Sequence, residues 1–160
     1  MSNEQKPAVP KPATKPKVSK NRRKSRELVL KGIYRSLINQ TELRVVLREL
    51  ADDPDFDRAD QDYLRQLLEG VLTHMPQLDQ RISGFLDRGV TELSPIEHGI
   101  LYLSAYELIH DLTIPYRVAI NEGVELAKLY GGIDGHKYVN GVLDKLAAEA
   151  RPDEVRRAPR

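Results

Sequence analysis

The sequence predicts an all-α protein of about seven helices, and three observations predict this class. Apolar residues recur at spacings of three and four over most of residues 21–150, which is the period of an amphipathic helix. The segment Ser94-Pro95-Ile96-Glu97 combines an N-cap serine, a proline at the first helical position and a glutamate three residues after the cap. Asn140-Gly141 would suit a hairpin, but the residues around it have a helical rather than an alternating period.

The chain begins with a segment unlike the rest. Residues 1–20 hold four prolines and few large apolar side chains. Such a segment buries too little surface to offset the entropy lost on ordering. We expect residues 1–20 to be a disordered Pro/Lys-rich arm, and residues 21–150 to form one helical domain.

Four helices are expected in the first half of that domain. The first runs from Asn21 to about Ile38, and the second is amphipathic from Leu43 to Leu50 before the turn-rich stretch ADDPDFD. The third starts near Tyr63. Pro76 either ends it or opens a fourth helix, which would bury Leu78, Ile82, Phe85 and Leu86.

Three helices are expected in the second half. Residues 95–110 are apolar nearly all round, which predicts a central buried helix. Pro115 opens the next helix, which Gly131-Gly132 closes, and Asp134 can cap a last helix that ends near Ala150. Gly123 and Gly141 predict close approaches between helices. Residues 151–160 are expected to be a flexible tail.

Composition and charge exclude some classes of function and favour others. Without cysteine, disulfides, thiolate zinc sites and thiol nucleophiles are excluded. The sequence contains no apolar run of about 18 residues and no signal peptide, so a cytoplasmic protein is expected. Residues 1–26 carry nine Lys or Arg and one acid, a net charge of +8, which leaves −7 on residues 27–160 of a chain whose total is +1. This asymmetry favours contact with nucleic acid, although a solubilising tail is an alternative.

Catalytic motifs are weak or missing. Glu107 and His110 have the Glu-x-x-His spacing of di-iron bundles, and Glu122 and Glu125 could add carboxylates, but only one copy of the motif is present. The sequence has no Gly-x-Ser-x-Gly elbow, phosphate loop or dinucleotide fingerprint. We therefore expect no catalytic residue, metal or cofactor.

Positive charge and tyrosines coincide at two places. Tyr34 lies among the basic residues of the first helix, and Lys137 and Tyr138 lie at the start of the last helix, where free N–H groups attract anions. Phosphates binding to cations and bases stacking on tyrosines would suit single-stranded RNA. Alternatively, the tyrosines are half-buried edges of the core. The basic residues of the first helix are Arg22, Arg23, Lys24, Arg26, Lys31 and Arg35.

Longer motifs resemble a known family. The runs Ile114-PYRVAINEGVELA-Lys128 and His136-KYVNGVLD-Lys145, with Tyr106-Glu107-Leu108 before them, are similar to the C-terminal half of the NusB family of bacterial transcription antitermination factors. The segment Arg22-Arg23-Lys24-Ser25-Arg26-Glu27 with Tyr34 resembles the arginine-rich first helix of that family. The resemblance covers about residues 21–150.

The resemblance implies two small helical bundles packed together and no catalytic activity. It also implies binding of boxA RNA from ribosomal RNA transcripts jointly with NusE, a ribosomal protein, in the complex that makes RNA polymerase resist termination. Several positions match residues that the family places near RNA, with Tyr130 and Asp134 beside them, whereas Lys31 and Arg35 are added by helical spacing alone. The matching positions are Arg22, Arg23, Lys24, Arg26, Tyr34, Lys137 and Tyr138. Glu97 matches an acidic position on the NusE-facing side.

Two features depart from the family pattern. A basic residue is expected near Tyr102, and the Pro/Lys-rich arm is longer than expected. The competing hypothesis is a helical scaffold that binds only proteins, without RNA specificity.

Overall fold

A computed structural model describes the backbone of residues 16–159 and the side chains of residues 21–159. This part of the chain is helical, with no strand, and no helix in it is long and apolar enough to cross a membrane. The elements are α1 (Pro16–Asn39), α2 (Leu43–Ala51), η1 (Phe56–Arg58), α3 (Gln61–Ser83), η2 (Val90–Glu92), α4 (Pro95–His110), α5 (Tyr116–Tyr130), α6 (Gly135–Ala150) and α7 (Pro152–Arg157).

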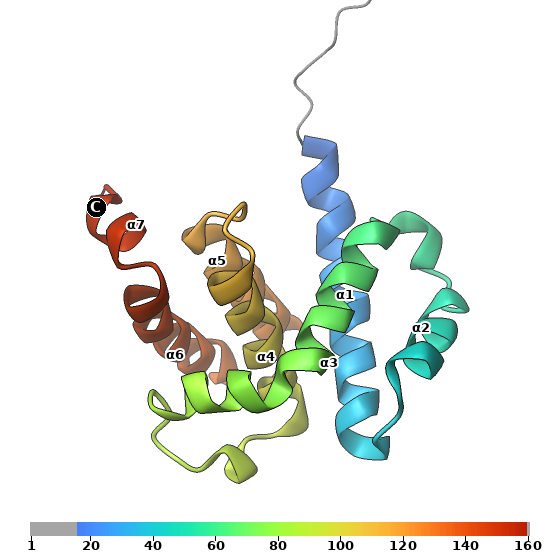
Figure 1. The fold of residues 1–160 in the computed structure, drawn as a ribbon, viewed down its shortest axis with the longest axis horizontal. Helices are drawn as coiled ribbons and strands as arrows, with labels where there is room; N and C mark the ends of the chain where they lie inside the picture. Colours follow the sequence, from blue (N-terminus) through green and yellow to red (C-terminus); the bar gives the residue numbers. More distant parts are fainter. Residues whose placement is uncertain (1–15, 160) are drawn as a thin grey trace, which may run out of the picture.

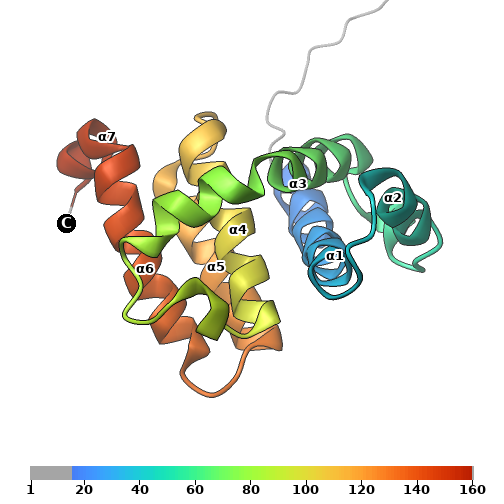
Figure 2. The same ribbon diagram turned by 60° about the horizontal axis from the view of Figure 1, so that its bottom comes forward.

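The helices form two groups that share one hydrophobic core (Figures 1 and 2). In the first, α2 and the first half of α3 pack on α1. In the second, α5 and α6 pack on α4, and the second half of α3 runs across toward α6. Contacts of α1 and α3 with α4 join the groups. The predicted two-bundle, all-helical fold is confirmed.

Helix α1 begins earlier than the sequence pattern predicts. Its backbone is helical from Pro16 rather than from Asn21. A proline is compatible with the first turn of a helix, because the N–H it lacks would have no partner there. Residues 1–15 of the expected disordered arm lie outside the described residues.

Pro76 lies just after a break within the span of α3. At this break His74 has the non-helical angles φ −110° and ψ 15°, so α3 consists of two helical segments joined by a kink. A proline removes a backbone hydrogen bond and crowds the preceding turn, which bends a helix. The Nδ1 atom of His74 lies 2.7 Å from the carbonyl oxygen of Gly70 in that turn. The two helices expected on either side of Pro76 are therefore both present, as the two segments of α3, and their kinked junction links the bundles.

Helix α4 is the central buried helix that the sequence predicts. The Ser94 hydroxyl accepts a 3.1 Å hydrogen bond from the Glu97 N–H, which confirms the predicted N-cap. A Cβ atom added to Gly123 of α5 would lie 2.3 Å from Ser104 Oγ of α4, so the predicted close approach there is confirmed. A Cβ at Gly141 would meet no atom within 4 Å, so that prediction was wrong.

Two predictions near the C-terminus were also wrong. Asp134 has a left-handed backbone, φ 66°, and its side chain caps nothing, because side-chain capping requires an extended backbone at the N-cap. Residues 152–157 form α7 rather than a flexible tail, and the Arg151 side chain before it is buried. Sequence periodicity cannot detect a helix of six residues that one buried arginine holds in place.

Candidate nucleic-acid interface

The first turns of the described part of α1 present the predicted basic cluster, with each cation held by a carboxylate. Arg23, whose side chain is 56% exposed, donates hydrogen bonds of 3.1 and 2.6 Å to the two carboxylate oxygens of Glu122. Lys24 donates a 3.1 Å bond to Glu27. The Arg22 guanidinium lies 3.8 Å from Asp60 and 4.1 Å from the centre of the Tyr63 ring. A phosphate group binding here would compete with these acids.

Arg26 does not belong to this surface, although the sequence places it there. Its side chain is 5% exposed, and its Nε atom donates a 2.8 Å hydrogen bond to Glu107, which is fully buried. Tyr63 donates a second hydrogen bond to the same oxygen. Burial raises the pKa of Glu107, and the positive charge of Arg26 opposes that rise. Arg26 is one turn from Arg22 and Arg23 but points into the core, so its predicted RNA contact is corrected to a structural ion pair.

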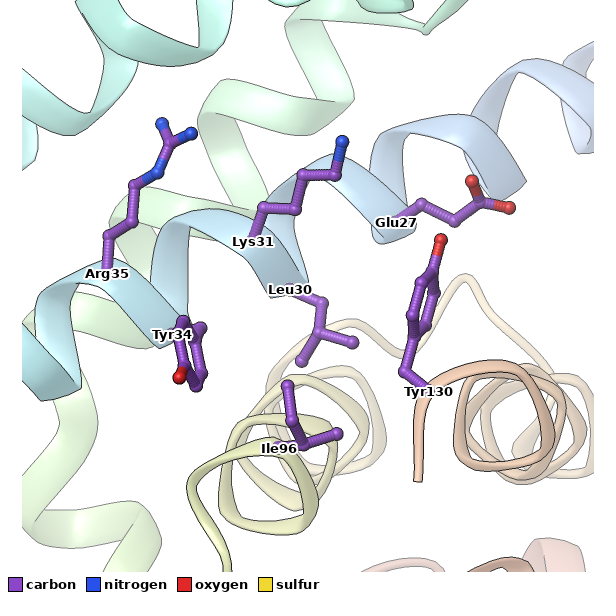
Figure 3. Close-up of a pocket in the computed structure, with 7 residues that line it drawn as sticks. All are labelled: Glu27, Leu30, Lys31, Tyr34, Arg35, Ile96 and Tyr130. Carbon is purple, nitrogen blue, oxygen red and sulfur yellow. The ribbon is translucent and has the colours of Figure 1, made fainter. Parts of the chain in front are cut away.

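A groove of about 290 Å³ brings four predicted residues together (Figure 3). Leu30 of α1 and Ile96 of α4 form its apolar floor, and Tyr34 and Tyr130 lie at opposite ends of it. Both tyrosines are exposed, at 40% and 44%. Their rings therefore offer surface to a ligand. The residues that line the groove are Glu27, Leu30, Lys31, Tyr34, Arg35, Ile96 and Tyr130.

The cations of the groove are also paired. Lys31 Nζ donates a 2.9 Å hydrogen bond to Asp53, and Arg35 Nη1 donates a 3.4 Å bond to Glu49. The hydrogen bond from the Asp55 N–H and the pairing with Lys31 lower the pKa of Asp53, so this carboxylate stays charged. Such pairs are weak at an exposed surface, at about 0–1 kcal/mol each. Phosphate can therefore displace the acids at small cost.

A second pocket adjoins the groove. It has a volume of about 430 Å³ and contains Arg23 and Lys24. Glu27 lines both pockets. Arg23, Lys24, Lys31, Tyr34, Arg35 and Tyr130 thus form one continuous surface along α1 and the end of α5, which we call the α1 surface.

The start of α6 carries the remaining predicted residues. Lys137 is 72% exposed and lies 3.4 Å from Asp134, which is also exposed. Tyr138 is half-buried instead. The guanidinium of Arg88 lies 4.3 Å from the centre of its ring, and its hydroxyl accepts a 3.4 Å hydrogen bond from the Asp87 N–H. One face of Tyr138 is therefore already covered by Arg88, a residue that the sequence did not indicate.

Glu97 connects α6 to the groove. It follows Ile96 of the groove floor, and its Oε2 atom lies 2.8 Å from the position that a Cβ atom of Gly135 would take. Its carboxylate thus lies at the N-terminus of α6, where backbone N–H groups favour negative charge. The contact of Glu97 with NusE stays a prediction.

Tyr102 does not leave a gap in the positive surface. It is buried, stacks on His98 with ring centres 4.2 Å apart, and donates a 2.7 Å hydrogen bond to Asp79. His98 Nε2 lies 2.7 Å from the other oxygen of Asp79. The position therefore serves the packing of α3 on α4.

The residues considered for a metal site are dispersed over separate contacts. Glu107 faces Arg26, and Glu122 faces Arg23. His110 packs against His74 with the rings tilted by 34° and their centres 4.8 Å apart. Within residues 21–159, no group of three or more histidines and carboxylates is placed to hold a metal ion.

Sequence reasoning missed Glu27, Leu30 and Ile96 as groove residues. Glu27 precedes Lys31 by four residues and Tyr34 by seven, so helical spacing alone could have placed it on the same face. Ile96 comes from another helix, and only the tertiary structure brings it there.

Known proteins match this chain over most of its length, and the matched residues include the α1 surface. The family model described as the NusB family matches residues 23–148. The transcription antitermination protein NusB of Methylobacillus flagellatus is 73% identical over 145 residues, which cover 91% of this chain and 94% of that protein. The protein of the same name from Thiobacillus denitrificans is 51% identical, covering 86% of this chain and 95% of that protein.

Solved structures give the same result. A T. maritima NusB structure has a TM-score of 0.75 and 28% identity, covering 89% of this chain and 99% of that chain. A crystal structure of the antitermination factors NusB and NusE in complex with dsRNA contains a chain with a TM-score of 0.65. That chain is 23% identical, and the match covers 79% of this chain and 96% of that one, which supports the fold. With most of its length matched by the family model and a 73% identical relative, this chain belongs to the NusB family.

Proposed function

We propose that this protein is a transcription antitermination factor that binds single-stranded boxA RNA together with NusE and helps RNA polymerase resist termination on ribosomal RNA genes. Its relatives at 73% and 51% identity are named transcription antitermination proteins. One observation carries the RNA-binding part of the proposal. The groove of Figure 3 combines an apolar floor with two exposed tyrosine rings, and Lys31 and Arg35 line it with their charged ends pointing away from the floor, toward Asp53 and Glu49.

Each component of the groove suits a single strand. Bases of single-stranded RNA are unstacked, so their faces can lie on tyrosine rings while their edges remain available. The phosphates on either side would meet Lys31 and Arg35 in the groove and Arg23 in the adjoining pocket. Lys137 at the start of α6 would extend this path beyond Glu97.

The partner and the setting are part of the same proposal. A related structure holds the antitermination factors NusB and NusE in complex with dsRNA. We propose that Glu97 of this chain faces NusE. Since phosphate and base binding need no reacting group, we propose that the protein acts in the cytoplasm as a binding factor, without catalysis or a cofactor.

The alternative is a helical scaffold that binds proteins without RNA specificity. One observation favours it, because Arg23, Lys24, Lys31 and Arg35 are all paired with carboxylates. In that case the positive charges would serve intramolecular ion pairs only.

Fluorescence anisotropy distinguishes these functions. A labelled boxA RNA and a scrambled RNA are each titrated with the full chain near physiological salt, with and without purified NusE. We expect boxA RNA to bind more tightly than the scramble and to gain affinity with NusE. Equal, weak and salt-sensitive binding of both RNAs would support the scaffold.

Arg23→Ala is expected to weaken binding of all RNA sequences alike, because a phosphate contact carries no base information. The plot of log K against log salt concentration should become shallower by about 0.7, the contribution of one single-strand phosphate contact. Arg81→Ala is the matched control, since Arg81 pairs with Glu149 between α3 and α6, away from the α1 surface. An unchanged slope for Arg23→Ala would remove Arg23 from the RNA path.

Tyr34→Ala is expected to cost about 1–3 kcal/mol of RNA-binding free energy, because it removes one stacking surface. The salt slope should stay the same, since no charge is lost. Tyr116→Ala is a control on a ring that lies in a different pocket, near the C-terminus. If Tyr34→Ala binds RNA like the parent protein and keeps its helical circular dichroism, then Tyr34 is only an edge of the core.

A further inference from the structure

Glu27 is an acid in a surface that should bind an anion. It lines both the groove and the adjoining pocket, and its side chain is 18% exposed. Figure 3 shows Glu27 and Tyr130 at one end of the groove and Tyr34 at the other. A carboxylate here repels the RNA backbone, so it lowers affinity unless it meets a hydrogen-bond donor of the ligand.

Glu27 is held in place rather than free to turn away. Lys24 donates a 3.1 Å hydrogen bond to its Oε1 atom and also lies 3.5 Å from Asp55. The bond with Glu27 raises the pKa of Lys24, so the Lys24 ammonium stays charged. A fixed carboxylate at one end of a tyrosine-walled groove is suited to reading the edge of a base.

We propose that Glu27 determines base specificity at this groove by accepting hydrogen bonds from the Watson–Crick edge of a guanine. This inference rests on the proposed RNA-binding function and assigns a ligand class to one part of it. The base would lie over Leu30 and Ile96, with a tyrosine ring at each end. The groove volume of about 290 Å³ is close to the lower end of the roughly 300–1,000 Å³ typical of small-ligand sites.

The chemistry of the four bases selects guanine. The N1–H and N2–H₂ groups of guanine are adjacent donors, which match the two oxygens of one carboxylate. Adenine and cytosine each present one amino group beside a ring-nitrogen acceptor, which a carboxylate repels. Uracil presents one N3–H between two carbonyl acceptors. The Tyr130 hydroxyl, at the same end of the groove, can donate to the O6 atom of guanine.

The test compares oligonucleotides that differ in one base. An oligouridine is titrated with the full chain, beside the same oligouridine carrying one central guanosine, adenosine or cytidine. A uniform strand can bind the protein in any register. Some of these registers place the single different base in the groove. We expect the parent protein to prefer the guanosine strand on the order of tenfold, the value of one good two-bond base contact.

Glu27→Gln is expected to lose that preference while still binding RNA. Asp55→Asn is the matched control, because it removes the other carboxylate of Lys24 but does not line the groove, and it should keep the preference. An inosine in place of the guanosine lacks only the N2 amino group. Compared with the guanosine strand, the inosine strand should bind the parent protein more weakly and the Glu27→Gln variant equally well. That difference would show that the N2 amino group interacts with the Glu27 carboxylate.

Other results would overturn the proposal. A parent protein without guanosine preference, or a Glu27→Gln variant that retains it, would show that Glu27 reads no base. Equal losses in Glu27→Gln and Asp55→Asn would mean that the carboxylates act only by holding Lys24. In these cases boxA RNA would still bind, so the proposed function would stand. If the parent protein bound neither boxA RNA nor any oligonucleotide, both proposals would fail together.

Discussion

Arg26→Ala is expected to destabilise the folded protein by about 3–5 kcal/mol, the usual cost of removing one partner of a buried ion pair. Arg26 donates to Glu107 at 2.8 Å, and Glu107 is fully buried between α1, α3 and α4. Without the guanidinium, the Glu107 carboxylate must remain charged without compensation or take up a proton. Urea unfolding followed by circular dichroism measures the loss.

The cost is high because the carboxylate has little other support. Its Oε2 atom also accepts a hydrogen bond from Tyr63, but its Oε1 atom, which is buried, has no hydrogen-bond partner within the described residues. Burial alone already raises the pKa of Glu107. Loss of the positive charge should raise it further, so the variant is expected to recover some stability as the pH falls.

Two comparisons isolate the ion pair. Arg23→Ala, on the same helix but at an exposed pair, should cost at most about 1 kcal/mol of stability. The double variant Arg26→Met, Glu107→Leu should recover most of the loss, because apolar residues often replace a buried pair at no cost. An Arg26→Ala protein with parental stability and a reduced RNA salt slope would return Arg26 to the RNA surface.

Arg26 also shows where sequence reasoning stops. Arg22, Arg23, Lys24 and Arg26 look equivalent in a basic run. Helical geometry alone distinguishes them, since Arg26 precedes Leu30 and Ile33 of the core by four and seven residues. The partner that makes burial tolerable, Glu107, lies 81 positions away. No local pattern indicates such a pairing.

Other parts of the structure were predictable because their signals are local. The Ser94 cap, the bounds of α4 at Pro95 and His110, and the end of α5 at Tyr130 follow from caps, prolines and glycines within a few residues. Tyr34, Lys31 and Arg35 could be placed on one helix face by spacing. Their meeting with Tyr130, about 100 positions later, forms the groove, and it depends on how α5 packs against α4.

The C-terminal segment gives the second large effect. Deleting residues 151–160, for which the sequence predicts a flexible tail, is expected to destabilise the protein by on the order of 3–5 kcal/mol. Arg151 is the main reason, because hydrogen bonds from a charged group contribute about 1.5–3 kcal/mol each. Its guanidinium donates to the carbonyl oxygens of Glu107, Leu108, Asp111 and Ile114 at 2.6 to 2.9 Å.

These carbonyls lie at and just beyond the end of α4, where a helix leaves acceptors without partners. The cation also interacts favourably with the negative end of the helix dipole. Glu154 of α7 adds a reciprocal contact, since its Oε2 atom accepts a 2.9 Å hydrogen bond from the Tyr116 N–H at the start of α5. That bond lowers the pKa of Glu154. Residues 151–154 thus satisfy both ends of the α4–α5 connection.

Three further variants test whether the contacts of Arg151, rather than the tail as a whole, stabilise the fold. Deleting residues 158–160 keeps Arg151 and Glu154 and should leave the urea midpoint nearly unchanged. Arg151→Ala should reproduce most of the full deletion, because it leaves the carbonyl oxygens of Leu108 and Ile114 without a hydrogen-bond donor, whereas those of Glu107 and Asp111 keep backbone N–H partners. Arg156→Ala, an exposed arginine paired with Asp153, should cost at most about 1 kcal/mol. If the full deletion unfolded at the parental urea concentration, then Arg151 and α7 would not stabilise the fold.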